Sequence, residues 1–175
     1  LDRGEDEDLV RQAMAEVHLV TRDIRAALEI YDDLLTRSAD SPKLWNERGV
    51  ALHQDGNYVD AEVSYRRAIG AEAGYALAHN NLGVALYQKG EGDAAVAEFR
   101  AALDAQPGLV KARLNLALLL YKAKRLQLAL DAYRQVLGSD SEHPVAWNGV
   151  GLVLADLRKF EDARNAFARA IQARP

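Results

Sequence analysis

Hydrophobic residues recur along the chain at helical spacing, in short blocks separated by turn sequences. In the stretch 76–109 the second block shows the i, i+4, i+7, i+8 spacing of one helix face: Ala95, Phe99, Ala102 and Leu103. The sequences QKGEG at 88–92 and AQPG at 105–108 interrupt the pattern with glycine and proline. The pattern therefore predicts two short helices joined by a tight turn and followed by a second turn.

The same pattern recurs every 34 residues along the chain. Three positions of the repeat carry one kind of side chain throughout: alanine (Ala27, Ala61, Ala95, Ala129, Ala163), aromatic (Tyr31, Tyr65, Phe99, Tyr133, Phe167) and aliphatic (Leu35, Ile69, Leu103, Leu137, Ile171). The chain contains only 7 Tyr and 3 Phe, so chance does not explain five aromatic residues in one series. The series define five units without insertions: 8–41, 42–75, 76–109, 110–143 and 144–175.

Glycines occur inside the first helix of several units, where they cost about 1 kcal/mol relative to alanine. Gly49, Gly83 and Gly151 occupy the same position of the 34-residue repeat. A residue without a side chain lets a bulky group of the partner helix approach the backbone. We therefore expect these glycines to be packing sites that receive a bulky group of the partner helix, with Phe99 filling the space between adjacent hairpins.

The repeat resembles the tetratricopeptide repeat (TPR) family over essentially residues 8–175. The unit that starts at Pro42 shows the family pattern most fully: Trp45, Gly49, Leu52, Gly56, Tyr58, Ala61, Tyr65 and Ala68. The resemblance implies an all-α fold, a right-handed superhelix of ten antiparallel helices. It also implies one TPR domain at 8–175, preceded by an acidic lead-in at residues 1–7.

Composition narrows the class of partner. The chain has a net charge of −4 and no cysteine. It therefore lacks the basic surface typical of nucleic-acid binding and cannot form disulfides. Its longest apolar run, LNLALLLY at 114–121, is too short to span a bilayer. We expect a protein or peptide partner, no nucleic acid and no membrane insertion. The composition fits both cytoplasm and periplasm, and we favour the cytoplasm.

The sequence shows no recognisable catalytic or metal-binding motif. The four histidines, His18, His53, His79 and His143, lack the spacing of a metal site. The close glycines of GVG at 149–151 and GEG at 90–92 follow no strand, unlike those of phosphate loops. We therefore expect no enzymatic activity, no metal and no cofactor.

The resemblance places the first helix of each unit on an inner surface, with the second, fifth, sixth, ninth, twelfth and thirteenth positions exposed. The candidate peptide-binding residues at such positions are Asn46, Asn80, Asn81, Val84, Tyr87, Lys111, Asn115, Leu118, Tyr121 and Asn148. An amide side chain carries both a donor and an acceptor, so it can match a peptide backbone of any sequence. Replacing Asn81 and Asn115 by alanine is expected to weaken binding while hardly changing the melting temperature.

Asn81 and Asn115 resemble the asparagine ladder of TPR arrays that bind extended peptides, including the arm of O-linked N-acetylglucosamine transferases. A clamp for chaperone tails is disfavoured, because only Asn81 and Lys111 match its five residues. The main hypothesis is a non-catalytic interaction module that binds a peptide segment of a partner. The alternatives are the docking arm of a larger enzyme, such as an O-linked glycosyltransferase, and a self-assembling scaffold.

The last unit is expected to expose apolar surface that a further repeat would cover. The residues expected there are Val153, Leu157, Phe167 and Ile171. Exposed apolar surface of this kind marks an interaction site. The sequence thus predicts either that the chain is a fragment of a longer protein or that another molecule, such as a second copy of the chain, covers this end.

Overall fold

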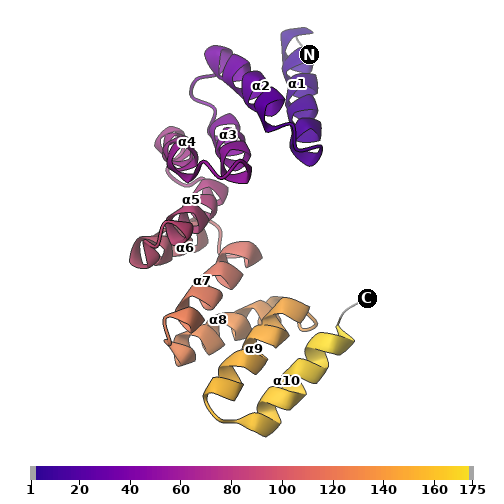
Figure 1. Ribbon diagram of the computed structural model, residues 1–175, viewed down its shortest axis with the longest axis vertical. Coiled ribbons are helices and arrows are strands. Elements are labelled where there is room, and N and C mark those ends of the chain that lie inside the picture. Colours follow the sequence, from indigo (N-terminus) through magenta and orange to yellow (C-terminus); the bar gives the residue numbers. More distant parts are fainter. Residues whose placement is uncertain (1–2, 174–175) are drawn as a thin grey trace. The chain divides into compact units, whose positions relative to one another are not determined.

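The computed structural model describes residues 3–173, which form ten α-helices and no strand (Figure 1). The helices are α1 (Arg3–Val20), α2 (Ile24–Arg37), α3 (Pro42–Gln54), α4 (Tyr58–Ala71), α5 (Ala76–Gln88), α6 (Gly92–Ala105), α7 (Val110–Lys122), α8 (Leu126–Ser139), α9 (Pro144–Asp156) and α10 (Phe160–Gln172). Two helices for each of five units, without strands, confirm the predicted all-α class.

The chain divides into two compact units, the first ending at Ala105 and the second beginning at Gln106. In the first unit α1 pairs with α2, α3 with α4 and α5 with α6, and α2 packs on α3 and α4 on α5. In the second unit α7 pairs with α8 and α9 with α10, while α8 packs on α9. Within each unit, a hairpin therefore presents its second helix to the first helix of the next hairpin.

The glycines of the first helices are packing sites, as the sequence predicted. A Cβ added to Gly83 would lie 2.7 Å from Phe99 Cε1, and one added to Gly49 would lie 2.5 Å from Tyr65 Cε1. The aromatic rings of Tyr65 and Phe99 are 1% and 2% exposed. Burial of such a ring contributes roughly 1.5–3 kcal/mol, which exceeds the helix penalty of the glycine.

The series Trp45, His79, Arg113 and Trp147 has a common hydrogen-bonding role. Trp45 Nε1 donates to the carbonyl oxygen of Ala39 at 2.7 Å, and Trp147 Nε1 donates to that of Ser141 at 2.8 Å. Arg113 donates to Pro107 O at 2.6 Å, and His79 Nε2 lies 3.0 Å from Ala73 O. In all four cases the acceptor is six residues earlier, so the side chain ties its helix to the turn that precedes it.

The turn inside each hairpin places one residue in the left-handed backbone region. These residues are also 34 apart: Arg22 (φ 61°), Gly56 (φ 80°), Gly90 (φ 86°), Lys124 (φ 57°) and Arg158 (φ 60°). Glycine adopts this conformation readily, whereas other L-residues pay roughly 1–2 kcal/mol. Three of the five turns therefore carry a conformational strain that the other two lack.

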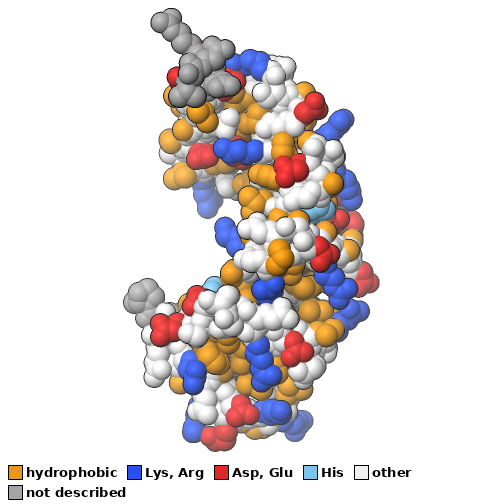
Figure 2. All heavy atoms as spheres, turned by 180° about the vertical axis from the view of Figure 1, so that it is seen from behind, with side chains coloured by type: hydrophobic (Ala, Val, Ile, Leu, Met, Phe, Trp, Pro, Cys, Tyr) orange, Lys and Arg blue, Asp and Glu red, His pale blue; other side chains and the backbone are white. Residues whose placement is uncertain are grey.

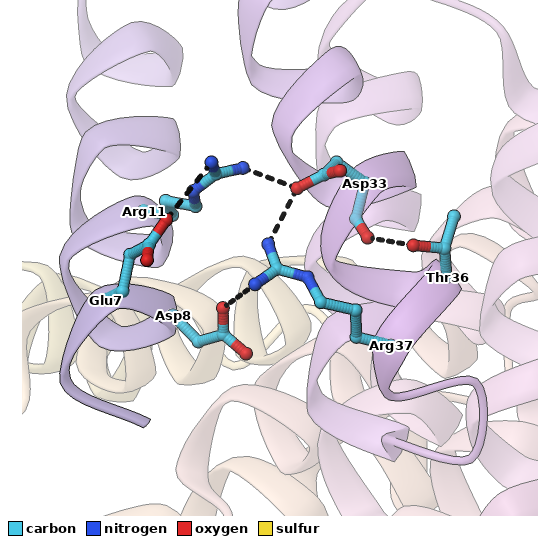
Figure 3. Close-up of polar contacts among 6 residues, drawn as sticks. All are labelled: Glu7, Asp8, Arg11, Asp33, Thr36 and Arg37. Carbon is cyan, nitrogen blue, oxygen red and sulfur yellow. Dashed lines mark hydrogen bonds and ion pairs between the residues drawn. The ribbon is translucent and has the colours of Figure 1, made fainter. Parts of the chain in front are cut away.

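The acidic segment at the start of the chain is largely helical, because α1 begins at Arg3. Glu7 pairs with Arg11 at 3.2 Å, and Asp8 pairs with Arg37 of α2 at 2.6 Å. Asp33 of α2 accepts from Arg11 at 2.5 Å and from Arg37 at 2.7 Å (Figure 3). We name these five residues the α1–α2 ion-pair network. Glu7 and Asp8 thus help to fasten α1 to α2.

Four apolar residues of the last hairpin were expected to be exposed: Val153, Leu157, Phe167 and Ile171. This expectation is correct for Ile171 and wrong for Val153. Ile171 is 73% exposed, whereas Val153 is fully buried, and Leu157 and Phe167 are partly buried. Val153 occupies the same repeat position as Ala51 and Ala85, which are also fully buried. This position faces the preceding hairpin, which buries it.

Replacing Gly83 by alanine should destabilise the protein by about 1–3 kcal/mol, because the new methyl group overpacks against Phe99. The matched control is Gly70→Ala in α4, where an added Cβ meets nothing within 4 Å. That change should stabilise the protein by about 0.5–1 kcal/mol, since alanine restricts the unfolded chain. Urea denaturation measures both, and equal effects of the two changes would refute the packing role of Gly83.

Replacing Arg158 by glycine should stabilise the protein by about 0.5–1 kcal/mol. The change removes left-handed strain of about 1–2 kcal/mol but adds about 0.5–1 kcal/mol of entropy loss on folding. The reverse change, Gly90→Ala, should destabilise, and an added Cβ there would meet no atom within 4 Å, so the effect is conformational. Thermal denaturation of both variants tests the strain, and a lower melting temperature for Arg158→Gly would contradict it.

Candidate functional site

The predicted binding residues lie on the first helices of the hairpins. We call the surface formed by α3 and α5 in the first unit, and by α7 and α9 in the second, the first-helix face of that unit. Within each unit these helices are neighbours, since α3 contacts α5 and α7 contacts α9. Side chains of successive repeats can therefore meet on this face.

In the first unit three asparagines form a chain of hydrogen bonds. Asn80 Nδ2 donates to Asn81 Oδ1 at 3.1 Å, and Asn81 Nδ2 donates to Asn46 Oδ1 at 2.9 Å. Asn46 is 7% exposed and Asn80 5% exposed. The expectation that the fifth repeat position is exposed is therefore wrong for both residues. Their amides link α3 to α5, and only Asn81 is partly exposed.

A small hollow lies beside Asn81 on the first-helix face of the first unit. Its volume is about 140 Å³, and its lining consists of Val50, His53, Gln54, Tyr65, Asn81 and Val84. Val50 and Val84 come from successive repeats and are both partly exposed. Burial lowers the pKa of His53, so the neutral imidazole is favoured there. The hollow thus combines an apolar lining with one amide group.

A larger hollow of about 530 Å³ lies elsewhere in the first unit, lined mainly by residues of α2, α3 and α4. It contains Trp45, Arg48 and Val63 together with Asp32 and other charged groups. Arg48 Nε already donates to Asp32 at 2.6 Å, and Arg48 also donates to Ser64 Oγ at 2.9 Å. Because its principal charges have partners, this hollow offers less to a ligand than its size indicates.

The second unit presents a more exposed group of predicted residues. Lys111 and Asn148 are exposed, and Leu118 is 41% exposed. Leu152 stands at the same repeat position as Leu118 and is 37% exposed, so the two form an apolar strip on α7 and α9. This strip corresponds to Val50 and Val84 of the first unit.

Three other predicted residues, Tyr87, Asn115 and Tyr121, are partly buried and engaged with neighbours. The ammonium of Lys124 lies 5.6 Å from the centre of the Tyr121 ring. Asn81 belongs to the first unit and Asn115 to the second, so an asparagine ladder joining them stays a prediction.

Sequence reasoning missed a polar group at the junction of α1 and α3. Lys43 Nζ donates to Gln12 Oε1 at 3.0 Å and pairs with Glu47 at 3.6 Å. Burial raises the pKa of Glu47, the Glu16 carboxylate acts in the same direction, and Lys43 opposes them. The Oε2 atom of Glu47 is buried and has no hydrogen-bond partner in the described chain. The only sign of this group in the sequence was that Glu47 occupies the sixth position of its repeat, one of the positions expected to be exposed.

The histidines have structural partners rather than a metal arrangement. His79 contacts Glu98 Oε2 at 2.7 Å through Nδ1, and His143 accepts from the backbone N–H of Ala146 at 3.4 Å. Residues 3–173 contain no group of three or more His, Cys, Asp or Glu side chains suited to a metal ion. Among the same residues, every helix is too short or too polar to cross a membrane.

A family model described as tetratricopeptide repeat matches residues 13–76, 60–110, 81–144 and 114–175. The chain belongs to the tetratricopeptide repeat family. The overlapping matches together run from residue 13 to residue 175. No curated protein is a significant match to the sequence.

Solved TPR structures show the same fold at low sequence identity. The chain matches PilF of Pseudomonas aeruginosa with a TM-score of 0.88 and 19% identity, over 99% of this chain and 79% of that one. It matches MamA with a TM-score of 0.81 and 19% identity, over 91% and 93% of the two chains. It also matches YrrB, described as a TPR protein with an unusual peptide-binding site, with a TM-score of 0.74, 20% identity and coverage of 98% and 90%.

From the sequence we expected that replacing Asn81 by alanine would hardly change the melting temperature. The hydrogen bond from Asn81 to the buried Asn46 predicts a larger effect. Asn81→Ala should destabilise the protein by about 1–2 kcal/mol, because it removes the donor to a buried amide oxygen. Asn148→Ala, at an exposed site, should change stability by less than about 0.5 kcal/mol. Chemical denaturation of the two variants measures the difference, and a neutral Asn81→Ala would show that the asparagine chain contributes nothing to folding.

Proposed function

We propose that this protein is a non-catalytic interaction module that binds an extended peptide segment of a partner on its first-helix face. The observation that carries the proposal is the hollow beside Asn81, where Val50 and Val84 of successive repeats meet. Packing within the repeat does not require an open apolar site at this place. An unfilled apolar hollow beside a polar group is typical of a site that anchors one side chain of a ligand.

The chemistry of the hollow fits a small apolar side chain of the peptide. Val50 and Val84 contribute apolar contact, and a volume of about 140 Å³ suits a side chain of aliphatic size. The Asn81 amide stands at the same place and can exchange hydrogen bonds with the peptide backbone. The buried amides of Asn46 and Asn80 then act as positioning groups, because they hold the Asn81 side chain in one orientation.

The exposed residues of the second unit supply the same two kinds of contact. Leu118 and Leu152 offer apolar surface, and Asn148 and Lys111 offer polar groups that remain exposed to solvent. The TPR fold, and the peptide-binding site named for YrrB, support this kind of partner. None of the arrangements described above pairs a nucleophile with a general base, which favours a binding role over a catalytic one.

Peptides selected from a random 12-residue phage-displayed library against the wild-type chain test the proposal. Val84→Glu should weaken the binding of the selected peptides by more than about tenfold, because it places an unpaired carboxylate in the apolar hollow. Fluorescence anisotropy with labelled peptides measures the dissociation constants.

Val59→Glu provides the matched control in the same unit. Val59 is 65% exposed on α4, and Asp93 and Glu161 occupy the same repeat position in other hairpins. This change should leave binding unchanged. Equal affinity of wild type and Val84→Glu, with both variants folded by circular dichroism, would place the site elsewhere.

A further inference from the structure

One face of α1 is apolar and exposed, although the same face is buried in later first helices. Val10, Met14 and Val17 are 59%, 50% and 61% exposed. They are spaced i, i+4, i+7 and so share one side of the helix. Hydrophobic side chains gather along this outer edge of α1 in Figure 2. Ala15, fully buried, points to the opposite side, where α1 meets α2.

The repeat shows what normally covers this face. The residues at the same repeat positions in α3, α5 and α9 are at most 4% exposed wherever they are apolar: Leu44, Ala51, Ala78, Leu82, Ala85, Ala146, Val150 and Val153. Each of these helices packs against the second helix of the hairpin before it, namely α2, α4 or α8. The face of α1 is therefore shaped for the second helix of a TPR hairpin.

In this packing the second helix contributes the other surface, and the corresponding surface of α10 is exposed. Ile171 is 73% exposed, whereas Leu35, at the same position of α2, is 7% exposed beneath α3. Phe167 is partly exposed, although the four other aromatic residues of its series are at most 4% exposed. A hollow of about 320 Å³ lies there, lined by Phe167, Ala170 and Ile171 of α10 and by residues of α9.

We propose that two copies of this chain associate head to tail, with α10 of one copy packed on the Val10–Met14–Val17 face of α1 of the next. The interface would repeat the packing that already joins α2 to α3, α4 to α5 and α8 to α9 within one chain. Val10, Met14 and Val17 would enter the hollow at Phe167 and Ile171. Because the two surfaces differ, the contact is heterologous and continues into longer oligomers rather than stopping at a dimer.

The α1–α2 ion-pair network holds α1 against α2, so that the face formed by Val10, Met14 and Val17 remains exposed. Arg11 and Arg37 bind Glu7, Asp8 and Asp33 across the junction of α1 and α2 (Figure 3). None of the three apolar residues takes part in it. The network therefore fastens α1 to its own hairpin without occupying the surface proposed for the second copy. None of the five residues of the network lines the hollow beside Asn81.

Sedimentation velocity of the 175-residue chain tests the proposal. One repeat-sized interface belongs to the small and weak class, so association should be followed up to about 1 mM protein. The weight-average mass of the wild type should rise at least about twofold over the range from about 10 µM to 1 mM. Val17→Glu and Ile171→Glu should each stay monomeric, because each buries an unpaired carboxylate in the interface.

An equimolar mixture of Val17→Glu and Ile171→Glu distinguishes head-to-tail association from other geometries. The first variant keeps an intact α10 surface and the second an intact α1 surface, so the mixture should form heterodimers and nothing larger. Leu128→Glu is the control, since Leu128 is 50% exposed at the position that Asp60 and Asp162 occupy in other hairpins. It should associate like the wild type.

Three results would overturn the proposal. A wild type that stays monomeric up to about 1 mM would show that the two surfaces do not recognise each other. A Val17→Glu variant that still dimerises would assign the contact to two α10 surfaces. A mixture that stays monomeric, while the wild type associates, would show that the intact α10 surface of one variant does not bind the intact α1 surface of the other. Circular dichroism confirms that each variant is folded.

Discussion

The structure depends on the contact between an aromatic ring of the second helix and a glycine of the first helix in the same hairpin. Tyr65 on Gly49 and Phe99 on Gly83 bring the two helix backbones so close that no side chain fits between them. In the fourth hairpin Ala117 replaces the glycine, and the Tyr133 ring instead meets Gly149 of the next hairpin. The aromatic ring is thus kept, while the glycine that receives it lies on the next hairpin, two residues before Gly151. This close approach sets which side of each first helix faces the core.

Once that orientation is set, the remaining surfaces of each first helix follow from it. One side packs on the preceding hairpin, as Ala51, Ala85 and Val153 show by their complete burial. The side chains of Val50, Asn81 and Val84 border the hollow instead, where no other helix covers them. On α1 the side that faces a preceding hairpin elsewhere carries exposed valines and a methionine. The proposed peptide site and the proposed association surface therefore both follow from one helix orientation.

The repeat period predicted the helices, the hairpin pairing and the packing glycines, because these depend on contacts that recur every 34 residues. Trp45, His79, Arg113 and Trp147 follow the same 34-residue period, but their shared bond to a carbonyl six residues earlier needed coordinates. The burial of Asn46 and Asn80 was not predictable, since it depends on one asparagine bonding to another across two repeats. The burial of Val153 required knowing which hairpin its position faces. The candidate site was predicted as a set of positions, and the hollow beside Asn81 became apparent only from the side-chain packing.

We propose that a peptide binds at the small hollow of the first-helix face and not at the larger hollow lined by Trp45 and Val63. Methyl-labelled NMR spectra recorded during titration with a selected peptide test this most directly. The methyl signals of Val50 and Val84 should shift progressively with peptide, while those of Val59 and Val63 should stay in place. Shifts at Val63 without shifts at Val50 and Val84 would contradict the account and assign binding to the opposite side of the hairpins.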